Sequence, residues 1–409
     1  MSTLADKPSS AEAAAAELGD GPRLTISGVE VMQIALPPRR EHPTASGMDV
    51  LGRYVITRVT TDQGISGLGE STVLPDWGGD HQRYFGESVG TTVHMIRDFF
   101  TPAIVGEDAF RISHVMNKLA RLIKGYPYAK AAIDMALHDI KGKALGVPVY
   151  DLLGGLYRSE VRMAHSIGIL DTDRAVSEAR EAISEGIKTI KLKIGKDARR
   201  DVEVVRAIRE EVGPDIEITV DANQGYASPK EAIKTLREMS AWDVRFAEQM
   251  VEGVEGLAQI AAAVDVPQMA DESAWTPFDI LDIVARNAAE FVSIYTTKPG
   301  GLLGAMRVGA VCQAAGIRCN VNGSAETGVG TAANLHLVAA CPPVVEANVF
   351  PVTRRDDNQP TKLAGAFYLD DIVKEPFAYR DGCMFPPSTP GLGVELDDEK
   401  VEKYLVRQK

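Results

Sequence analysis

Two lysines stand two residues apart in the run 187–195, which otherwise alternates like a β-strand. Alternate side chains of a strand share a face, so Lys191 and Lys193 point one way while Ile190 and Leu192 point the other. Each ammonium disfavours the charged form of the other, and burial adds to this effect. We therefore expect the lysine pKa values to fall toward the range of a general base. Taken alone, the pair is equally compatible with an exposed strand edge protected by lysines.

Residues that can do chemistry also end the strand-like runs further along the chain. They recur at intervals of roughly 23 to 28 residues, close to the length of one βα repeat. Each is therefore expected at the carboxyl end of a successive strand, where barrel active sites are built. The residues are Asp221 with Asn223, Glu248, Asp271 with Glu272, Lys298 and Glu326.

Three of these residues are carboxylates on consecutive strands, namely Asp221, Glu248 and Asp271. Such an all-oxygen site suits Mg²⁺, with Mn²⁺ as an alternative, because these hard ions bind carboxylates and keep positions open for a substrate. Without a cation, three converging acids would repel one another strongly. For any single acid, capping of the next helix is the simpler explanation, but several successive strand ends of this kind favour a metal site.

Lys298 ends the sixth run and the lysine pair ends the second, so in a barrel of eight strands they face each other across the acids. A carboxylate substrate on the metal would present its α-carbon between amines on opposite sides. The metal would neutralise the charge that forms when the α-proton leaves. A surface lysine in a loop is the alternative for Lys298, but the Pro-Gly-Gly after it favours a tight turn and a helix N-terminus facing an anion.

The elements that must position these residues alternate regularly from residue 161 onward. Eight strand-like runs are separated by amphipathic helical segments, such as 175–185, 201–212 and 229–239. This alternation predicts an α/β fold, a (β/α)8-type barrel rather than an open sheet. The runs are 162–167, 189–194, 216–221, 244–248, 267–271, 291–297, 317–321 and 344–349.

A different pattern precedes the barrel. Strand-like runs come first and helical patterns follow without alternation, which indicates an α+β unit that would cap the barrel. The strands are expected at 24–36, 54–60 and 65–70, and the helices at 86–100, 109–123 and 128–145. The predicted divisions are a mobile arm, 1–22, an α+β capping domain, 23–150, a modified barrel domain, 151–358, and a C-terminal segment, 359–409, that packs back on the cap.

Composition argues against several classes of partner. The 409 residues include 44 basic and 57 acidic ones, a net charge of −13, with no basic cluster dense enough for a phosphate backbone, so nucleic acid is not expected. No apolar run approaches the roughly 20 residues that cross a bilayer, and the N-terminus lacks a signal-peptide pattern. We therefore expect no membrane association and a cytoplasmic protein. The four cysteines show no metal-ligand spacing and are expected to be reduced.

Together these motifs resemble the enolase superfamily, and within it the muconate lactonizing enzyme (muconate cycloisomerase) subgroup of the mandelate racemase/muconate lactonizing enzyme family. The resemblance runs from about residue 24 to the C-terminus and includes Lys-Leu-Lys at 191–193, Ala-Asp-Glu-Ser at 270–273, and Thr-Pro-Gly-Leu-Gly at 389–393. It implies an α+β cap on a modified barrel, with the metal on the three acids.

The resemblance also implies roles for the remaining polar residues. Lys193 would be the base, and Lys191 would tune it and contact the substrate carboxylate. Lys298 would be the opposite acid/base or a cationic stabiliser. Glu326 matches an acid that often partners the substrate or a lysine. Relatives are commonly homo-oligomers, so the same is implied here.

An isomerase that moves a proton α to the carboxylate of a small-molecule substrate is therefore expected. The leading hypothesis is a cycloisomerase acting on a muconate-like diacid, for which one lysine suffices. A racemase or epimerase of an N-acyl amino acid, dipeptide or proline betaine needs both Lys193 and Lys298, and a dehydratase is a related outcome. A non-catalytic barrel scaffold is the remote alternative.

Two polar loops of the cap, 39–47 and 74–84, are expected to select the substrate. Trp77 in the second loop is a candidate for packing on a quaternary ammonium, although a structural packing role is the simpler interpretation. The rim near Glu326 is unusually polar because it carries Asn320, Asn322 and Ser324. A muconate pocket does not obviously need these groups.

Overall fold

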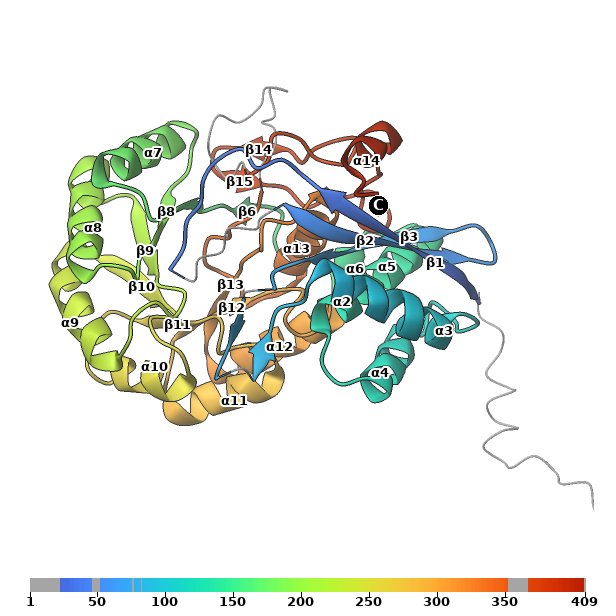
Figure 1. Cartoon of the computed structure of the whole chain (residues 1–409), viewed down its shortest axis with the longest axis horizontal. Coiled ribbons are helices and arrows are strands. Elements are labelled where there is room, and N and C mark those ends of the chain that lie inside the picture. The colour runs from blue at the N-terminus through green and yellow to red at the C-terminus, as the bar shows by residue number, and fades with distance from the viewer. Residues whose placement is uncertain (1–22, 46–51, 76, 82, 352–366, 408–409) are drawn as a thin grey trace, which may run out of the picture.

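The computed structural model describes residues 23–45, 52–75, 77–81, 83–351 and 367–407. The expected N-terminal arm, 1–22, lies outside the described residues, and the proposed domain boundaries stay predictions. Figure 1 shows two units side by side: a barrel with an outer ring of helices, and a smaller unit in which helices pack on a sheet.

The smaller unit contains an antiparallel sheet covered by helices. Strands β1 (Ile26–Ala35), β2 (Arg53–Thr61) and β3 (Ser66–Thr72) form a meander. Helix α5 (Pro127–Leu145) lies so close to β3 that a Cβ on Gly69 would be 1.8 Å from the carbonyl oxygen of Ala132. Glycine at this position therefore lets the helix and the sheet touch. The other helices are α2 (Val89–His94), the π-helix η1 (Met95–Phe100), α3 (Thr101–Ile104), α4 (Ile112–Leu122) and α6 (Val149–Leu152).

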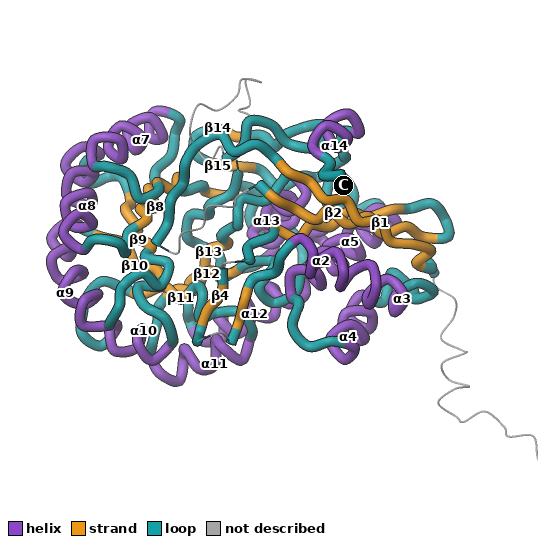
Figure 2. The backbone as a smooth tube through the Cα atoms, in the orientation of Figure 1, coloured by secondary structure: helices purple, strands orange, loops and turns teal. Residues whose placement is uncertain are grey.

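Seven parallel strands form the barrel sheet within the described residues, and neighbours in the sheet are neighbours in the chain. Helices form the outer layer around them (Figures 1 and 2). The strands are β7 (His165–Ile167), β8 (Thr189–Lys193), β9 (Glu217–Asp221), β10 (Val244–Glu248), β11 (Gln268–Ala270), β12 (Phe291–Ile294) and β13 (Arg318–Val321). The helices are α7 (Thr172–Ser184), α8 (Ala198–Val212), α9 (Pro229–Met239), α10 (Val254–Ala261), α11 (Pro277–Arg286), α12 (Leu302–Ala315) and α13 (Gly328–Ala340). The expected barrel with an N-terminal α+β unit is thus confirmed, with one correction.

The eighth predicted strand, 344–349, is not a regular strand. It joins β13 and the segment before β7 through isolated bridges, so it closes the barrel without a continuous ladder. Pro342 and Pro343 precede it and lack the backbone N–H groups that a ladder needs. The side chain of Asn348 takes one ladder position instead, since its Oδ1 accepts a hydrogen bond from the Val321 backbone N–H at 2.8 Å.

Caps and an apolar face explain why the barrel helices form where they do. Helix α8 is preceded by Asp197, whose side chain accepts hydrogen bonds from two backbone N–H groups of the first turn. It ends at Gly213, whose φ of 75° suits glycine. Between these ends, Val204 and Ile208 are buried at helical spacing and join the apolar core.

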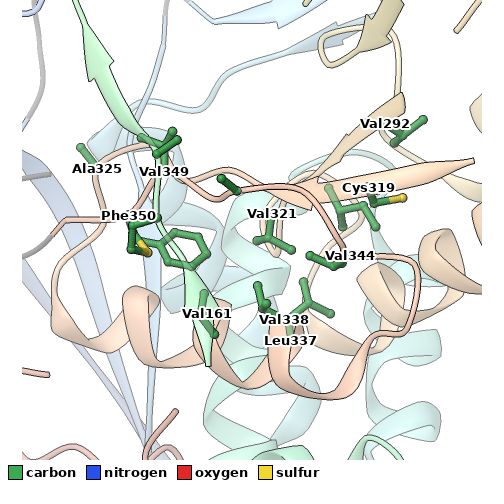
Figure 3. Packing of buried hydrophobic residues seen from close by; sticks show 14 of the residues in the cluster. Val161, Val292, Cys319, Val321, Ala325, Leu337, Val338, Val344, Val349 and Phe350 are labelled. Carbon is green, nitrogen blue, oxygen red and sulfur yellow. The ribbon is translucent and has the colours of Figure 1, made fainter. Parts of the chain in front are cut away.

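The main apolar core lies between the barrel strands and their helices and extends into the irregular segment 344–349. Figure 3 shows Val321 of β13 and Val344 of that segment close to Leu337 and Val338 of α13. All four side chains are buried. Packing therefore holds the irregular segment where backbone pairing is sparse.

The end of the chain returns to the smaller unit. Leu405 forms a bridge with Ile34 of β1, and the Val406 backbone N–H donates to the Gln33 carbonyl at 2.8 Å. Helix α14 (Asp398–Tyr404) lies beside this sheet in Figure 1. Strands β14 (Tyr379–Arg380) and β15 (Cys383–Met384) form a small sheet with β6 (Val161–Arg162). No helix in the described part of the chain is long and apolar enough to span a membrane.

Candidate active site

Strand register brings the predicted carboxylates into one row at the carboxyl ends of the barrel strands. Lys193 of β8 pairs with Asp221 of β9, and Asp221 pairs with Glu248 of β10. Glu248 pairs with Met269 of β11, and Asp271 lies two residues further along, on the same face. We call Asp221, Glu248 and Asp271 the acid row. All three are almost fully buried.

Two lysines neutralise one end of the acid row. The Lys191 ammonium lies 2.8 Å from both Asp221 Oδ2 and Glu248 Oε1. The Lys193 ammonium donates to Asp221 Oδ2 and to Asn223 Oδ1, each at 2.7 Å. Both lysines are buried, which excludes the exposed strand edge considered above.

The expected fall in lysine pKa is wrong for Lys191. Burial lowers its pKa, but the negative charges of Asp221 and Glu248 outweigh burial and raise the pKa above its ordinary value. The same contacts act on Asp221, where burial raises the pKa but Lys191 and Lys193 outweigh burial and lower it. The prediction considered the neighbouring lysine and omitted the acids of the next strands, which lie close enough to dominate.

Lys298 neutralises the other end of the acid row. Its ammonium donates to Asp271 Oδ1 at 2.7 Å and to the backbone carbonyls of Asp271, at 2.9 Å, and Ser293, at 2.8 Å. These contacts use all three of its N–H donors. The ammonium also lies 4.5 Å from the centre of the Tyr295 ring. The lysine is 2% exposed, so the alternative of a surface lysine is excluded.

The acid row has the donor chemistry of a Mg²⁺ site. In the present arrangement, no cluster of three or more His, Cys, Asp or Glu side chains in the described residues is placed to hold a metal ion. Lysines instead pair with the acids. The Lys191 ammonium sits between oxygens of Asp221 and Glu248, and Glu248 Oε2 is buried without a hydrogen-bond partner. Burial and the charge of Asp221 raise the pKa of Glu248 to about 8. Three buried carboxylates, one with a free oxygen, therefore fit a hard divalent cation.

Residues just beyond the strands hold the acid row in place. Asn223 and Gln249 have φ values of 42° and 36°, in the left-handed region that non-glycine residues rarely adopt. Asn223 accepts from Lys193 and donates to Glu272 Oε1 at 3.1 Å. Gln249 Oε1 accepts from the Asp271 backbone N–H at 2.9 Å. Sequence reasoning did not identify Gln249, although its place directly after a predicted ligand was a signal.

Glu272 and Glu326 are buried acids that pair with no lysine among the described residues. Burial and the charge of Asp271 raise the pKa of Glu272 well above its ordinary value. Glu326 Oε1 accepts from the Ser324 backbone N–H at 2.8 Å, and burial raises the pKa of Glu326 to about 7. The described residues give Glu326 no lysine partner, and its neighbours Ser324 and Ala325 line a pocket beside the lysine pair; contact of Glu326 with a substrate stays a prediction.

A pocket with an empty volume of about 610 Å³, part of it open to solvent, lies beside the lysine pair. Lys191, Lys193 and Asn223 line it together with Trp77 from the second cap loop. The Trp77 ring stacks on Trp275 with ring centres 5.1 Å apart, which agrees with the packing interpretation of this residue.

Several lining residues were missed by sequence reasoning. His42 Nε2 lies 3.2 Å from Ser166 Oγ, and both residues line the pocket. Tyr295 also lines it and donates to Asp271 Oδ2 at 3.3 Å. The first cap loop was expected to meet substrate, but no sequence signal shows which barrel residue His42 faces. The remaining lining residues include Thr44, Leu74, Asn322, Ser324 and Phe367.

Comparison with protein families gives one match in each unit. Residues 29–154 match the family "Mandelate racemase / muconate lactonizing enzyme, N-terminal domain". Residues 174–401 match the family "Enolase C-terminal domain-like". The first range contains the α+β unit and the second contains the acid row with all of its lysines.

Full-length relatives carry more than one activity. Muconate cycloisomerase 1 of Rhodococcus opacus is 33% identical over 93% of this chain and 98% of its own length. N-succinyl-L-Arg/Lys racemase of Bacillus cereus is 31% identical over 94% of this chain and 99% of its own.

Similar solved structures also include both a racemase and a lactonizing enzyme. The Bacillus cereus racemase superposes with a TM-score of 0.85 at 29% identity, covering 94% of this chain and 99% of the racemase. Muconate lactonizing enzyme from Pseudomonas fluorescens, complexed with muconolactone, superposes with a TM-score of 0.83 at 30% identity, covering 94% of this chain and 100% of that enzyme. At this level of identity, neither activity is preferred by similarity alone.

Proposed function

Because this chain belongs to the enolase superfamily, in its muconate lactonizing enzyme subgroup, and is an isomerase, we propose that it moves a proton to or from the carbon α to a substrate carboxylate. One observation carries the proposal. Lys193 lines the pocket, and within the described residues two side chains hold its ammonium at the end of the acid row.

Lys193 is assigned the role of acid/base. Its partners Asp221 and Asn223 are side chains of the next strand end, so the ammonium can leave them by rotation of its own four-carbon chain. Lys191 contacts two acids and lines the same pocket, which suits it to bind the substrate carboxylate and to adjust Lys193. Trp77 and Asn223 would form part of the wall against which the substrate is oriented.

Asp221, Glu248 and Asp271 would hold Mg²⁺, which when bound neutralises negative charge that develops on the substrate carboxylate. To share one ion, these acids would exchange their present lysine contacts, so the Lys193 ammonium would have one carboxylate fewer beside it.

Cycloisomerisation of a muconate-like diacid is the outcome that the lysine geometry supports best. One carboxylate of the diacid adds to a carbon–carbon double bond, and Lys193 gives a proton to the carbon α to the other carboxylate; the reverse reaction returns that proton to Lys193. A single acid/base residue completes this change. Lys298 is held by two backbone carbonyls and would serve as a fixed positive charge.

The test is turnover of cis,cis-muconate with Mg²⁺ in D2O, followed by NMR of the lactone. We expect deuterium at the α-carbon on one face, loss of turnover in Lys193→Ala, and retained single-face incorporation in Lys298→Ala. Full turnover and deuterium incorporation in Lys193→Ala would contradict the assignment of this lysine.

Racemisation or epimerisation of an amino-acid derivative is the second candidate function. It is favoured by the buried ammonium of Lys298 at the opposite end of the acid row from Lys193. The neutral polar side chains of His42, Ser166 and Asn322 in the pocket also suit an amide group.

The second candidate is tested by screening N-acyl amino acids, dipeptides and proline betaines for inversion at the α-carbon in D2O. A two-base racemase loses inversion in Lys298→Ala but retains exchange of the α-proton of one enantiomer through Lys193. Continued inversion in Lys298→Ala excludes the two-base version.

A further inference from the structure

Residues 77–81 and 83–85, at the end of the second cap loop and called the cap loop from here on, contact the rim of the barrel. Gln224 Nε2 donates to the Gly78 carbonyl at 2.8 Å, and the Tyr84 hydroxyl donates to Asp279 Oδ2 at 2.8 Å. A Cβ on Gly79 would lie 2.1 Å from the carbonyl oxygen of Glu272, so the two backbones are in direct contact. The cap loop therefore lies against the turn that follows β11, which also carries Asp271.

Asp80 makes the cap-loop contact that leads to the acid row. Its φ of 51° is in the left-handed region, which Asp tolerates better than most residues. Asp80 Oδ1 accepts from the Ser273 hydroxyl at 2.7 Å, and Ser273 Oγ accepts from Gln249 Nε2 at 2.9 Å. Gln249 Oε1 in turn accepts from the backbone N–H groups of Asp271, at 2.9 Å, and Ser273, at 3.1 Å. A continuous series of hydrogen bonds thus joins the cap loop to Asp271.

The cap loop also carries part of the pocket wall. Trp77 lines the pocket, stacks on Trp275, and lies with its ring centre 5.9 Å from the Lys298 ammonium. The Trp275 indole N–H donates to the carbonyl of Glu272 at 2.8 Å. Movement of the loop would therefore change the pocket wall and the turn after β11 together.

We infer that Asp80 is a positioning residue that couples the seating of the cap loop to the placement of Asp271, acting through Ser273 and Gln249. With the loop seated, the amide of Gln249 is oriented to hold the Asp271 backbone. With the loop lifted, Ser273 loses the acceptor that orients its hydroxyl. Gln249 keeps its hydrogen bond to the Val251 carbonyl, at 2.9 Å, but its contact with Ser273 is less ordered, and the carboxylate of Asp271 is less well placed for a metal. The inference rests on the proposed role of Asp271 as a metal ligand. It implies that the metal site is complete only when the cap loop closes the pocket.

The first test is Mg²⁺ affinity, measured by isothermal titration calorimetry without substrate. We expect Asp80→Ala to weaken Mg²⁺ binding by about tenfold, the size of effect typical for residues that orient a metal ligand. Asp80→Asn keeps an oxygen acceptor and should stay within about threefold of wild type. Glu252→Ala is the matched control because Glu252 accepts from the His81 backbone N–H of the same loop at 2.5 Å and does not belong to the series that reaches Asp271.

The second test does not require metal. The chain has 3 tryptophans, so their indole N–H resonances can be assigned by replacing each in turn. The Trp275 indole N–H reports on the turn after β11, and we expect its hydrogen exchange to be at least tenfold faster in Asp80→Ala but unchanged in Glu252→Ala. Ser273→Ala removes the same link and replaces Asp80→Ala if that variant does not fold.

Two results would overturn the coupling. One is Trp275 exchange in Asp80→Ala that matches wild type, and the other is an equal loss of Mg²⁺ affinity in Asp80→Ala and Glu252→Ala. Faster Trp275 exchange combined with no Mg²⁺ binding by the wild-type protein would support the coupling of loop and turn and would instead refute the proposed metal site.

Discussion

Lys193 and Lys298 stand at opposite ends of the same row of acids, but different kinds of partner hold them. Lys193 contacts two side-chain oxygens, from Asp221 and Asn223, and lines the pocket. Lys298 contacts one carboxylate and two backbone carbonyls, those of Asp271 and Ser293. Burial alone does not separate them, because both are at most 9% exposed.

The difference comes from where the partners lie in the fold. Asp221 is the last residue of β9 and Asn223 lies two residues beyond it, and their side chains can rotate or bind another cation without moving the barrel. Ser293 lies inside β12, so its carbonyl cannot leave Lys298 unless the strand moves. In the proposed function, Lys193, which is held by side chains, exchanges a proton with the substrate, and Lys298, which is held partly by the backbone, supplies a fixed charge. The predictions below test this contrast, from the largest expected effect to the smallest.

Replacement of the acid/base lysine should have the largest effect. We expect Lys193→Ala to lower kcat about 1,000-fold, since general acid–base groups contribute roughly 10²- to 10⁴-fold. Lys298→Ala should lower kcat by about tenfold. Steady-state kinetics on the substrate identified by the deuterium experiment measures both. The exposed Lys196 is the matched control, and Lys196→Ala should leave kcat unchanged. Equal losses of kcat in Lys193→Ala and Lys298→Ala would contradict the proposed difference between the two lysines.

Stability should show the opposite order. Lys298→Ala leaves Asp271 buried without its lysine, and we expect a loss of about 3 kcal/mol in the free energy of unfolding, as is common when one partner of a buried pair is removed. Lys193→Ala should cost less because Asp221 keeps Lys191 at 2.8 Å. Urea unfolding followed by circular dichroism measures both. A larger loss in Lys193→Ala would show that Lys191 does not compensate the charge of Asp221.

Binding of Mg²⁺ should depend on carboxylates from both ends of the acid row. At a concentration one hundred times its dissociation constant, the ion should add about 2.7 kcal/mol to the stability of the folded state, and chelation should remove this gain together with activity. The gain should be lost in both Asp221→Asn and Asp271→Asn, because the proposed ion is shared by acids from each end. Thermal unfolding with and without Mg²⁺ measures it, and full activity after exhaustive chelation would refute the metal site.

Glu70 is a buried carboxyl that pairs with no lysine in the described part of the chain, in contrast to the acids at both ends of the acid row. This residue of β3 accepts hydrogen bonds from Thr327 and Gly330, yet burial raises its pKa from 4.5 to about 8. Folding therefore favours the protonated form. This preference contributes to the stability of the folded state; the contribution is complete below about pH 4.5 and is lost as the pH rises through 8. We expect the stability of wild type to fall relative to Glu70→Gln by at most about 1.4 kcal/mol per pH unit across this window.

Urea unfolding at pH 6 and pH 9 compares the two proteins. Parallel loss of stability in wild type and Glu70→Gln would mean that Glu70 is not the titrating group. The lysine-paired Asp221 gives the reference, because its pKa is lowered and its charge should not change in this range.

The acid row was predictable from sequence because two simple periodicities determine it. A strand's alternation puts Lys191 and Lys193 on one face, and the βα repeat puts Asp221, Glu248 and Asp271 at successive strand ends. Register then aligns them, and parallel pairing of neighbouring strands leaves little choice of register once their apolar faces are buried. The eighth strand was not predictable in the same way, since its ladder is replaced by the side chain of Asn348.

The amino-acid sequence thus specifies the chemical groups and the strand ends that carry them. The folded structure adds the contacts between these groups: the acids that reverse the expected pKa of Lys191, the backbone carbonyls that fix Lys298, and the contact of Asp80 with Ser273. These contacts join residues from different elements, and their distances depend on how loops and strand ends approach in space. Periodicity describes each element alone, so it cannot supply them.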